Sequence, residues 1–211
     1  ALPDLKLLIT TGARNNSFDV KACAERGVTV CGTGAAGSPT TGIAFGLMLE
    51  LTRRIGFENA RLKAGAPWQT TIGRDLEGLT LGILGLGKLG QRSAAVGKAF
   101  GMKTITWSQN LTEEKAKAAG ADYVSKDDLF RNADFVTIHL VLSDRSRDLV
   151  GAKELGLMKK SAYLINTSRG PIVDEKALIA VLNSKSIAGA GLDVFDIEPG
   201  RNRRHCVHAD H

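Results

Sequence analysis

The sequence contains few cysteines, few aromatic residues and no long hydrophobic run. Cys23, Cys31 and Cys206 show neither the spacing of metal ligands nor a paired framework, which suits a reducing compartment, and we predict a cytoplasmic protein. No apolar stretch approaches the ~20 residues of a membrane-spanning helix and no signal peptide opens the chain, so we expect no membrane association. No basic stripe is interleaved with aromatic residues, which argues against a nucleic-acid partner.

The charge and the composition indicate a globular protein. The 28 basic residues exceed the 22 acidic ones, but Arg201, Arg203 and Arg204 near the end supply part of this excess. With 43% hydrophobic residues, a chain of 211 residues can build one large or two small domains around a core. Because the first residue is Ala1 and a strand-like run follows at residues 5–10, we expect the chain to begin inside a domain.

A glycine-rich stretch at residues 85–90, with the sequence GLGKLG, is the most informative feature of the chain. Residues 80–84 before it form an apolar run typical of a strand. Residues 90–100 after it carry small and apolar side chains at helical spacing. A G-x-G-x-x-G motif at a strand-to-helix turn predicts a dinucleotide site, whereas the alternative is a glycine-rich turn used only for packing.

The residues of this motif have separate expected roles. Gly85 permits a tight turn, Gly87 lets the backbone approach a pyrophosphate, and Gly90 lets the helix pack closely against the strand. The free N–H groups of Lys88 and Leu89 at the start of the helix would bind the pyrophosphate.

Helices and strands alternate from the glycine motif onward, which predicts a parallel sheet with helices on both faces. We expect strands at residues 80–84, 103–107, 123–124, 135–139, 162–166 and 188–193, and helices at residues 88–100, 112–119, 126–131, 152–158 and 175–184. Six strands in this rhythm favour an α/β fold with a doubly wound parallel sheet of the Rossmann type. Asp174 is expected to cap the last helix.

The N-terminal part reads as a β-α-β piece. Strands at residues 5–10 and 28–30 flank a helix at residues 20–26, which Asp19 caps and Gly27 ends. A loop of small residues follows.

A long helix is expected after this loop, over residues 40–64. Ile43, Leu47, Leu51 and Ile55 recur at helical spacing, and a bend is expected near Gly56.

The end of the strand at residues 103–107 bears on which dinucleotide binds. This strand normally ends in an acidic residue that holds the adenosine ribose, but Ser108-Gln109-Asn110 follows here, with Ser108 as the expected contact. Without a carboxylate nothing repels a 2′-phosphate, which inclines the prediction toward NADP. No Arg follows Ser108 to clamp such a phosphate, however, and the choice between NAD and NADP stays open.

Two later strands end in polar or charged residues, at the edge of the sheet where ligands bind. Thr167-Ser168-Arg169 follows the first, and Asp193 ends the second. The planar guanidinium of Arg169 suits a carboxylate or the carbonyl beside one, although an arginine that bridges two loops is an alternative. Asp193 could accept a hydrogen bond from a nicotinamide amide or simply cap a turn.

Three stretches together resemble the D-isomer-specific 2-hydroxyacid dehydrogenases. They are the glycine motif, the N-T-S-R-G stretch at residues 166–170 with P-I-V-D-E after it, and the G-L-D-V-F-D-x-E-P stretch at residues 191–199. Their order and separation also match, and the resemblance covers residues 2–199. It implies a Rossmann domain together with part of a second, flavodoxin-like substrate domain.

The resemblance also implies an organisation of the chain and a homodimer. Residues 1–36 correspond to the C-terminal part of the substrate domain, and residues 37–66 to the helix that joins the domains and builds the dimer. Residues 67–199 correspond to the dinucleotide-binding domain, which leaves residues 200–211 as an atypical tail.

The mechanism implied is the transfer of a hydride between a nicotinamide and the carbon that bears the substrate's oxygen. Arg169 matches the arginine that holds the 2-oxoacid carboxylate and polarises its carbonyl. Glu198 matches the glutamate that raises the pKa of a histidine, so that the imidazolium can protonate the developing alkoxide. Asp193 matches the residue that binds the nicotinamide amide. The other implied contacts are Lys88, Leu89, Ser146, Thr167 and Ser168 with the cofactor, and Ala13 and Arg14 with the substrate carboxylate. The side chain of Arg14 either adds a contact there or points to solvent.

The sequence departs from the family at the histidine. In relatives this residue lies well after the E-P pair in a P-H-x-G setting, which this chain lacks; residues 200–211 read GRNRRHCVHADH instead. His205 follows Glu198 too closely to take the same place, and the histidines around Cys206 match no structural zinc pattern, so we predict no metal site. His139 ends a strand, where a structural or cofactor-side role is expected. The abrupt change of composition predicts a disordered or foreign tail.

Three functions fit these observations. The first is an NAD(P)-dependent dehydrogenase for a small 2-hydroxy or 2-oxo acid of the glyoxylate or hydroxypyruvate kind, although the chain as it stands lacks the proton donor. The second is a non-catalytic dinucleotide-binding protein, such as a relative of the C-terminal-binding-protein corepressors. The third is an enzyme of the formate dehydrogenase branch, whose substrate residues would lie mostly outside this sequence.

Overall fold

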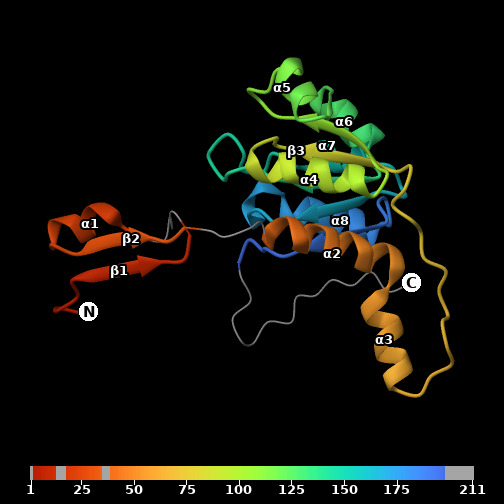
Figure 1. Cartoon of the computed structure of the whole chain (residues 1–211), viewed down its shortest axis with the longest axis horizontal. Helices are drawn as coiled ribbons and strands as arrows, with labels where there is room; N and C mark the ends of the chain where they lie inside the picture. The colour runs from red at the N-terminus through yellow and green to blue at the C-terminus, as the bar shows by residue number, and fades with distance from the viewer. Residues whose placement is uncertain (1, 13–17, 35–38, 198–211) are drawn as a thin grey trace. The chain divides into compact units, whose positions relative to one another are not determined.

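The computed structural model describes residues 2–12, 18–34 and 39–197. By its internal contacts the chain divides into two compact units, Ala1–Pro39 and Thr40–His211. Figure 1 labels the helices of both units and the strands β1, β2 and β3.

The first unit is a parallel β-α-β piece, as the sequence indicates. Its elements are β1 (Leu7–Thr10), α1 (Val20–Glu25) and β2 (Thr29–Gly32), and the two strands pair in parallel. Asp19 caps α1 by accepting a hydrogen bond from the Ala22 N–H at 2.9 Å. Gly27 follows the helix with a φ of +69°, a conformation that favours glycine. β2 begins and ends slightly later than expected, because its register with β1 starts at Thr29.

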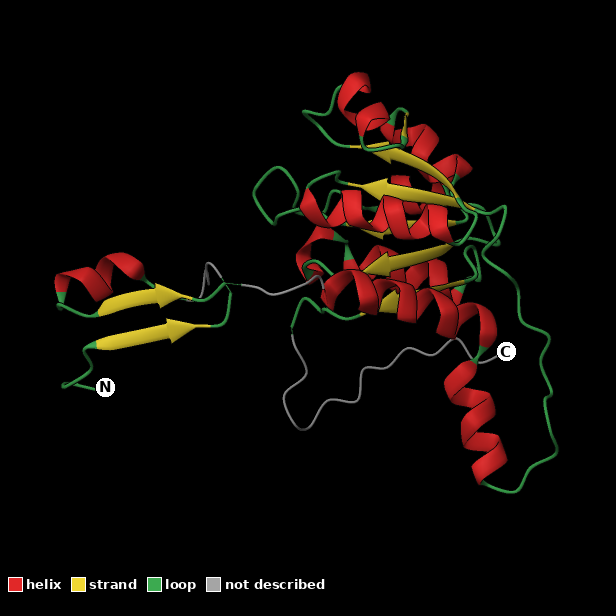
Figure 2. Ribbon diagram, in the orientation of Figure 1, coloured by secondary structure: helices red, strands yellow, loops and turns green. Residues whose placement is uncertain are grey.

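The second unit is built on a six-stranded parallel sheet in the order β5-β4-β3-β6-β7-β8. The strands are β3 (Thr80–Leu84), β4 (Lys103–Trp107), β5 (Asp122–Tyr123), β6 (Phe135–Ile138), β7 (Tyr163–Asn166) and β8 (Gly189–Leu192). Figure 2 draws the strands as yellow arrows with red helices around them. β3 lies between β4 and β6, so the direction in which the sheet grows reverses there. This is the doubly wound Rossmann order, in which the crevice at the carboxyl ends of β3 and β6 is the usual ligand site.

Helices cover both faces of this sheet (Figure 1). They are α2 (Pro39–Arg53), α3 (Ile55–Lys63), α4 (Lys88–Ala99), α5 (Glu113–Ala118), α6 (Lys126–Asn132), α7 (Ala152–Leu157) and α8 (Glu175–Asn183), with a short 3-10 turn η1 (Gly170–Ile172). One hydrophobic cluster packs α2, α4 and α5 around Leu81 and Ile83 of β3. A second cluster packs α6, α7 and α8 around Leu84 on the opposite face. Successive side chains of β3 point to opposite faces of the sheet, so the core consists of two layers, one on each face.

The long helix breaks near Gly56, as predicted. α2 and α3 are separated at Arg54, whose φ of 49° is left-handed. The Glu50 side chain accepts a hydrogen bond from the Gly56 N–H at 2.8 Å, and this bond caps the start of α3.

The buried face of α2 also differs from the expected stripe. Ile43 and Ile55 are 46% and 56% exposed, whereas the buried residues of the helix are Thr41, Ala44, Phe45, Met48 and Thr52. Leu47 and Leu51 of the expected stripe are half-buried and lie against β8, where a Cβ added at Gly191 would come 3.0 Å from the Cβ of Leu47. The lack of a side chain at Gly191 lets α2 lie close to the sheet.

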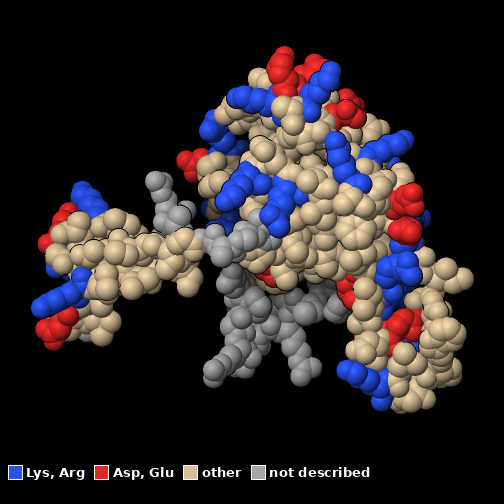
Figure 3. Space-filling view, in the orientation of Figure 1, with Lys and Arg blue, Asp and Glu red and all other residues tan. Residues whose placement is uncertain are grey.

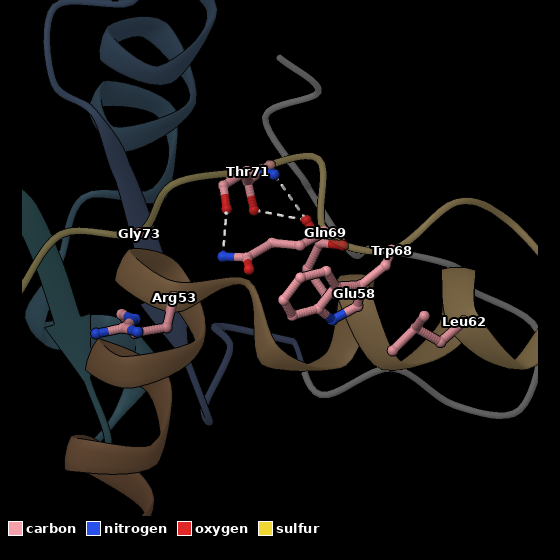
Figure 4. A pocket seen from close by; sticks show the side chains of 7 residues that line it. All are labelled: Arg53, Glu58, Leu62, Trp68, Gln69, Thr71 and Gly73. Carbon is pink, nitrogen blue, oxygen red and sulfur yellow. Dashed lines mark hydrogen bonds between the residues drawn. The ribbon is translucent and has the colours of Figure 1, made fainter.

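Residues 67–73 run alongside α3 and are held there by Glu58 (Figure 4). Glu58 Oε1 accepts hydrogen bonds from the Thr70 and Thr71 N–H groups at 3.1 and 2.9 Å and from the Thr71 hydroxyl at 2.7 Å. The Thr71 hydroxyl is the largest cause of a Glu58 pKa below its ordinary value. A cavity of about 170 Å³ lies here, lined by Arg53, Glu58, Leu62, Trp68, Gln69, Thr71 and Gly73.

The surface of the described residues carries charges of both signs. Lys and Arg side chains are scattered among Asp and Glu over the face shown in Figure 3, with wide uncharged areas between them. In this part of the chain no helix combines the length and the apolar character needed to cross a bilayer.

Candidate functional site

The candidate site begins at the glycine turn between β3 and α4. Gly85 has a φ of +100°, which glycine adopts easily, and a Cβ there would lie 2.7 Å from the carbonyl oxygen of His139. A Cβ on Gly90 would collide with the carbonyl oxygen of Gly85. At Gly87, in contrast, a Cβ would meet no atom of the described chain within 4 Å. The turn is therefore closed on the protein side and open at Gly87.

The N-terminus of α4 presents N–H groups at this opening. The Gln91 N–H donates to the Gly87 carbonyl at 2.9 Å, which is the first bond of the helix. The N–H groups of Lys88 and Leu89 come before it and have no acceptor within the helix. Gly87 is the N-cap residue and has no side chain that could cap them. With the helix dipole added, this end of α4 can hold a phosphate group.

Hydrogen bonds join the glycine turn to the strands on both sides of β3. The Gly85 N–H donates to the Trp107 carbonyl at the end of β4 at 2.9 Å. The His139 N–H, just after β6, donates to the Leu84 carbonyl at 2.8 Å. The turn thus lies on a continuous sheet edge formed by three strands.

Arg169 follows β7, and Asn166 fixes its backbone. The Asn166 side chain is buried; its Nδ2 donates to the Arg169 carbonyl at 3.0 Å and its Oδ1 accepts from the Ser168 N–H at 3.1 Å. The Ser168 hydroxyl donates to the Ile138 carbonyl at the end of β6, at 2.7 Å. The Arg169 side chain is exposed, and one of its terminal N–H groups donates to the Ser168 carbonyl at 2.6 Å. The guanidinium therefore stands at the surface of a well-ordered loop.

Asp193 directly follows β8, beside the loop of Arg169. Its N–H donates to the Asn166 carbonyl at 3.0 Å, and its side chain is exposed. A Cβ on Gly170 would collide with the backbone of Phe195, so the loops after β7 and β8 pack against each other without an intervening side chain. The structure therefore places Arg169 and Asp193 on adjacent loops, at the same sheet edge as the glycine turn.

Three other residues are predicted to contact the cofactor through their hydroxyl groups, and their surroundings differ. They are Thr167, Ser108 and Ser146. The Thr167 hydroxyl oxygen is buried and has no hydrogen-bond partner among the described residues. Ser108 is half-buried just after β4. The Ser146 hydroxyl donates to the Val141 carbonyl at 2.7 Å and accepts from the Ser143 N–H at 2.8 Å, so it closes its own loop. To contact a cofactor, the Ser146 hydroxyl would have to bond the cofactor in addition to these two partners or in place of one of them.

His139 lies beneath the glycine turn and is mostly buried. Its Nε2 is 2.9 Å from the Ser93 hydroxyl of α4 and 3.2 Å from the Thr137 hydroxyl of β6. Its Nδ1 is buried and has no partner within the described ranges. Burial lowers the pKa of His139 from 6.5 to about 4, because the cationic form would lose its hydration. The imidazole is therefore neutral near pH 7 and connects α4 to β6.

We expect the stability of the fold to fall as the pH is lowered from 6.5 toward 4. In this range the unfolded chain protonates His139 and the folded protein does not, so acid favours unfolding; above pH 6.5 both forms are neutral and the effect vanishes. The loss should total roughly 3 kcal/mol of unfolding free energy, at about 1.4 kcal/mol per pH unit. Urea denaturation of the wild type and of His139→Gln, at a series of pH values, measures it. The difference between the two proteins should grow on acidification, and parallel profiles would contradict the assignment.

The chain matches one known protein family over most of its length. The family described as "D-isomer specific 2-hydroxyacid dehydrogenase, NAD binding domain" matches residues 45–211, which include residues 200–211. The chain belongs to the D-isomer-specific 2-hydroxyacid dehydrogenase family.

Individual members of this family align with nearly the whole chain. A glyoxylate reductase from Thermococcus litoralis is 39% identical over 210 residues, which cover 95% of this chain and 63% of that protein. The structure of a phosphoglycerate oxidoreductase from Vibrio cholerae is similar with a TM-score of 0.87 at 36% identity, over 94% of this chain and 64% of that one. A D-lactate dehydrogenase from Aquifex aeolicus, complexed with NAD and lactic acid, gives a TM-score of 0.76 at 32% identity, over 92% and 59%. The chain thus spans about 63% of the length of the curated relatives it matches.

Several residues predicted for the site of a 2-hydroxyacid dehydrogenase lie outside the described residues. These are Glu198, Ala13 and Arg14. The tail at residues 200–211, where no site residue is predicted, also lies outside the described residues. Within residues 2–12, 18–34 and 39–197, no three His, Cys, Asp or Glu side chains gather in a way that could hold a metal ion.

Two residues at the site of this family member were not singled out from the sequence. Asn166 positions the Arg169 backbone, and a signal was available, because an Asn at a strand end commonly forms a turn with the residues after it. Ser93 bonds His139 from 46 positions away, and no local pattern predicts that contact.

Proposed function

We propose that the protein is an oxidoreductase that transfers a hydride between NAD(P) and a small 2-hydroxy or 2-oxo acid. The observation that carries the proposal is the common sheet edge, where the open glycine turn follows β3 and the exposed guanidinium of Arg169 follows β7. One of these features suits a pyrophosphate and the other suits a carboxylate. Membership of a family of dehydrogenases supports the same reading.

The residues present fit a dinucleotide. The space at Gly87, which a side chain would partly fill, gives the pyrophosphate access to the N–H groups of Lys88 and Leu89. The Thr167 hydroxyl is buried and has no partner among the residues that the structure describes, so it is a polar atom that a ligand could satisfy. Asp193, exposed at the end of β8, can accept a hydrogen bond from the nicotinamide amide. When bound, the nicotinamide ring donates or accepts the hydride.

Arg169 is proposed to bind the acid. Its guanidinium can hold the carboxylate of a 2-oxoacid through two N–H groups and polarise the carbonyl oxygen beside it. This geometry requires only a short molecule, so glyoxylate, hydroxypyruvate and pyruvate are the substrates to test first. The roles of Glu198, Ala13 and Arg14 stay predictions from the sequence, as does the preference for NADP over NAD.

We also propose the organisation and the homodimer that the family resemblance implies. Residues 1–36 would be part of a substrate domain and residues 67–199 the dinucleotide domain. The segment from α3 to residue 72 exposes a set of large apolar side chains that a second copy of the chain could cover, namely Ile55, Phe57, Leu62, Trp68 and Ile72. Sedimentation equilibrium tests this, and a monomer at micromolar concentration would refute the dimer.

The proposed function is tested by binding and turnover measured together. We expect both NADH and NADPH to bind, and the absorbance of at least one of them to fall with glyoxylate, hydroxypyruvate or pyruvate. Formate with the oxidised cofactors belongs in the same panel, because turnover there alone would assign the protein to the formate branch. Binding without turnover would favour a non-catalytic dinucleotide-binding protein. Failure to bind either cofactor would refute the proposal.

A further inference from the structure

A cavity lies between the start of α4 and α5, next to the glycine turn. Its volume is about 290 Å³, and it is lined by Leu86, Gln91, Leu111, Lys115, Ala118 and Ala119. Leu86 belongs to the glycine turn itself, and the Gln91 side chain donates to the Leu86 carbonyl at 3.2 Å. One wall of the cavity is therefore part of the turn, and the opposite wall belongs to α5.

The cavity borders the place where a bound dinucleotide would put its adenosine ribose. β3 and β4 are neighbours with Leu84 opposite Trp107, and the Gly85 N–H donates to the Trp107 carbonyl. The residues directly after β4 therefore lie beside the glycine turn. In Rossmann folds the ribose is held at the end of this second strand. Leu111, which lines the cavity, donates its N–H to the Ser108 carbonyl at 3.1 Å, so the cavity begins beside the residues that follow β4.

The charges around the cavity favour an anion at this point. No acidic residue follows β4, where Ser108, Gln109 and Asn110 stand. Lys115 is the basic residue that lines the cavity, and no carboxylate of the described chain lies within ion-pair distance of it. Its α5 neighbours Glu113 and Glu114 do not line the cavity. The ammonium group can therefore meet a phosphate without first breaking an ion pair.

We propose that Lys115 binds the 2′-phosphate of an NADP-type dinucleotide in this cavity and so makes the protein prefer NADPH to NADH. The inference rests on the proposed function, because it assigns one end of the same dinucleotide site. A cavity of this size is several times the ~30 Å³ that one water occupies, so a phosphate and its remaining hydration fit. Lys115 supplies a point charge, which replaces the arginine that is absent after Ser108.

The test compares Lys115→Met with Lys117→Met by calorimetric titration of NADPH, NADH, adenosine 2′,5′-bisphosphate and AMP. Methionine keeps much of the length and the apolar stem of lysine but removes the charge. Lys117 lies on the same helix, is exposed and does not line the cavity, so it is the matched control. In Lys115→Met we expect the affinity for NADPH and for the bisphosphate to fall roughly 10- to 100-fold, while NADH and AMP change by less than about twofold. Lys117→Met should leave all four affinities unchanged.

The outcomes separate this inference from the proposed function. Equal binding of NADPH and NADH by the wild type, or an equal loss for both in Lys115→Met, would overturn the role of Lys115 and leave the dehydrogenase proposal intact. Failure of the wild type to bind any dinucleotide would overturn both. Thermal melting of the two variants, which should match that of the wild type, shows whether the fold is retained.

Discussion

Replacing Arg169 with alanine is expected to lower kcat/KM for the 2-oxoacid by about 10²- to 10³-fold while the affinity for the dinucleotide changes by less than about twofold. The reason is that the side chain is exposed and its loop is fixed independently of it. The side chain of Asn166 bonds the backbone of Ser168 and Arg169, and the Ser168 hydroxyl bonds the Ile138 carbonyl. None of these hydrogen bonds involves the Arg169 side chain. Truncation should therefore remove the guanidinium and leave the sheet edge in place.

Two further variants sharpen this experiment. Arg169→Lys keeps the charge but loses the planar pair of donors, and it should recover only part of the activity. Arg131→Ala is the control, because Arg131 is exposed in the last turn of α6 and pairs with Asp127 and Asp128 away from the glycine turn. It should leave kcat/KM unchanged. An equal loss of cofactor affinity and of activity in Arg169→Ala would contradict a role in binding the substrate.

Alanine at Gly90 and alanine at Gly87 are expected to fail in different ways. The new Cβ at Gly90 would collide with the backbone carbonyl of Gly85, which no side-chain rotation can relieve. We expect Gly90→Ala to lower the melting temperature by about 5 °C or more and to weaken dinucleotide binding by over about 100-fold. The Cβ at Gly87 meets nothing within 4 Å, and the φ of −72° suits alanine, so the melting temperature without ligand should stay unchanged.

Gly87→Ala should nevertheless weaken dinucleotide binding by about tenfold or more, because its methyl group would stand where the pyrophosphate approaches the backbone. Differential scanning fluorimetry without ligand and calorimetry with NADPH and NADH separate the two effects. Gly156 in α7 provides the matched control, because a Cβ there also meets nothing within 4 Å. If Gly87→Ala and Gly156→Ala bind the dinucleotide equally well, the turn does not carry the pyrophosphate.

The part of the fold that follows from local signals could be predicted from the sequence. β3 has the expected bounds, because an apolar run before a glycine turn is a strong signal, and α4 begins at Lys88 as expected. Asp19 and Asp174 both cap their helices through the side chain, as their positions before apolar helical patterns indicate.

The parts that depend on distant contacts could not be predicted. The close approach of α2 to the sheet depends on Gly191, which lies far along the chain in β8. The left-handed Arg54 has no sequence signature, so the sequence predicts a break near Gly56 but not the residue at which it occurs. The sequence alone predicts an ordinary surface lysine at position 115. The structure places Leu86 and Gln91 with it around one cavity, and this arrangement of distant residues has no local sequence signal.

The hydrogen bonds that link each loop to the neighbouring strand end have a consequence for ligand binding. Because the N–H groups of Gly85, His139 and Asp193 donate to residues of adjacent strands, this edge of the sheet is ordered before any ligand arrives. The conformational entropy of these loops is lost when the sheet folds and not when the ligand binds. A small acid, which can offer only a few contacts, can therefore be held by a surface that needs no rearrangement beneath it.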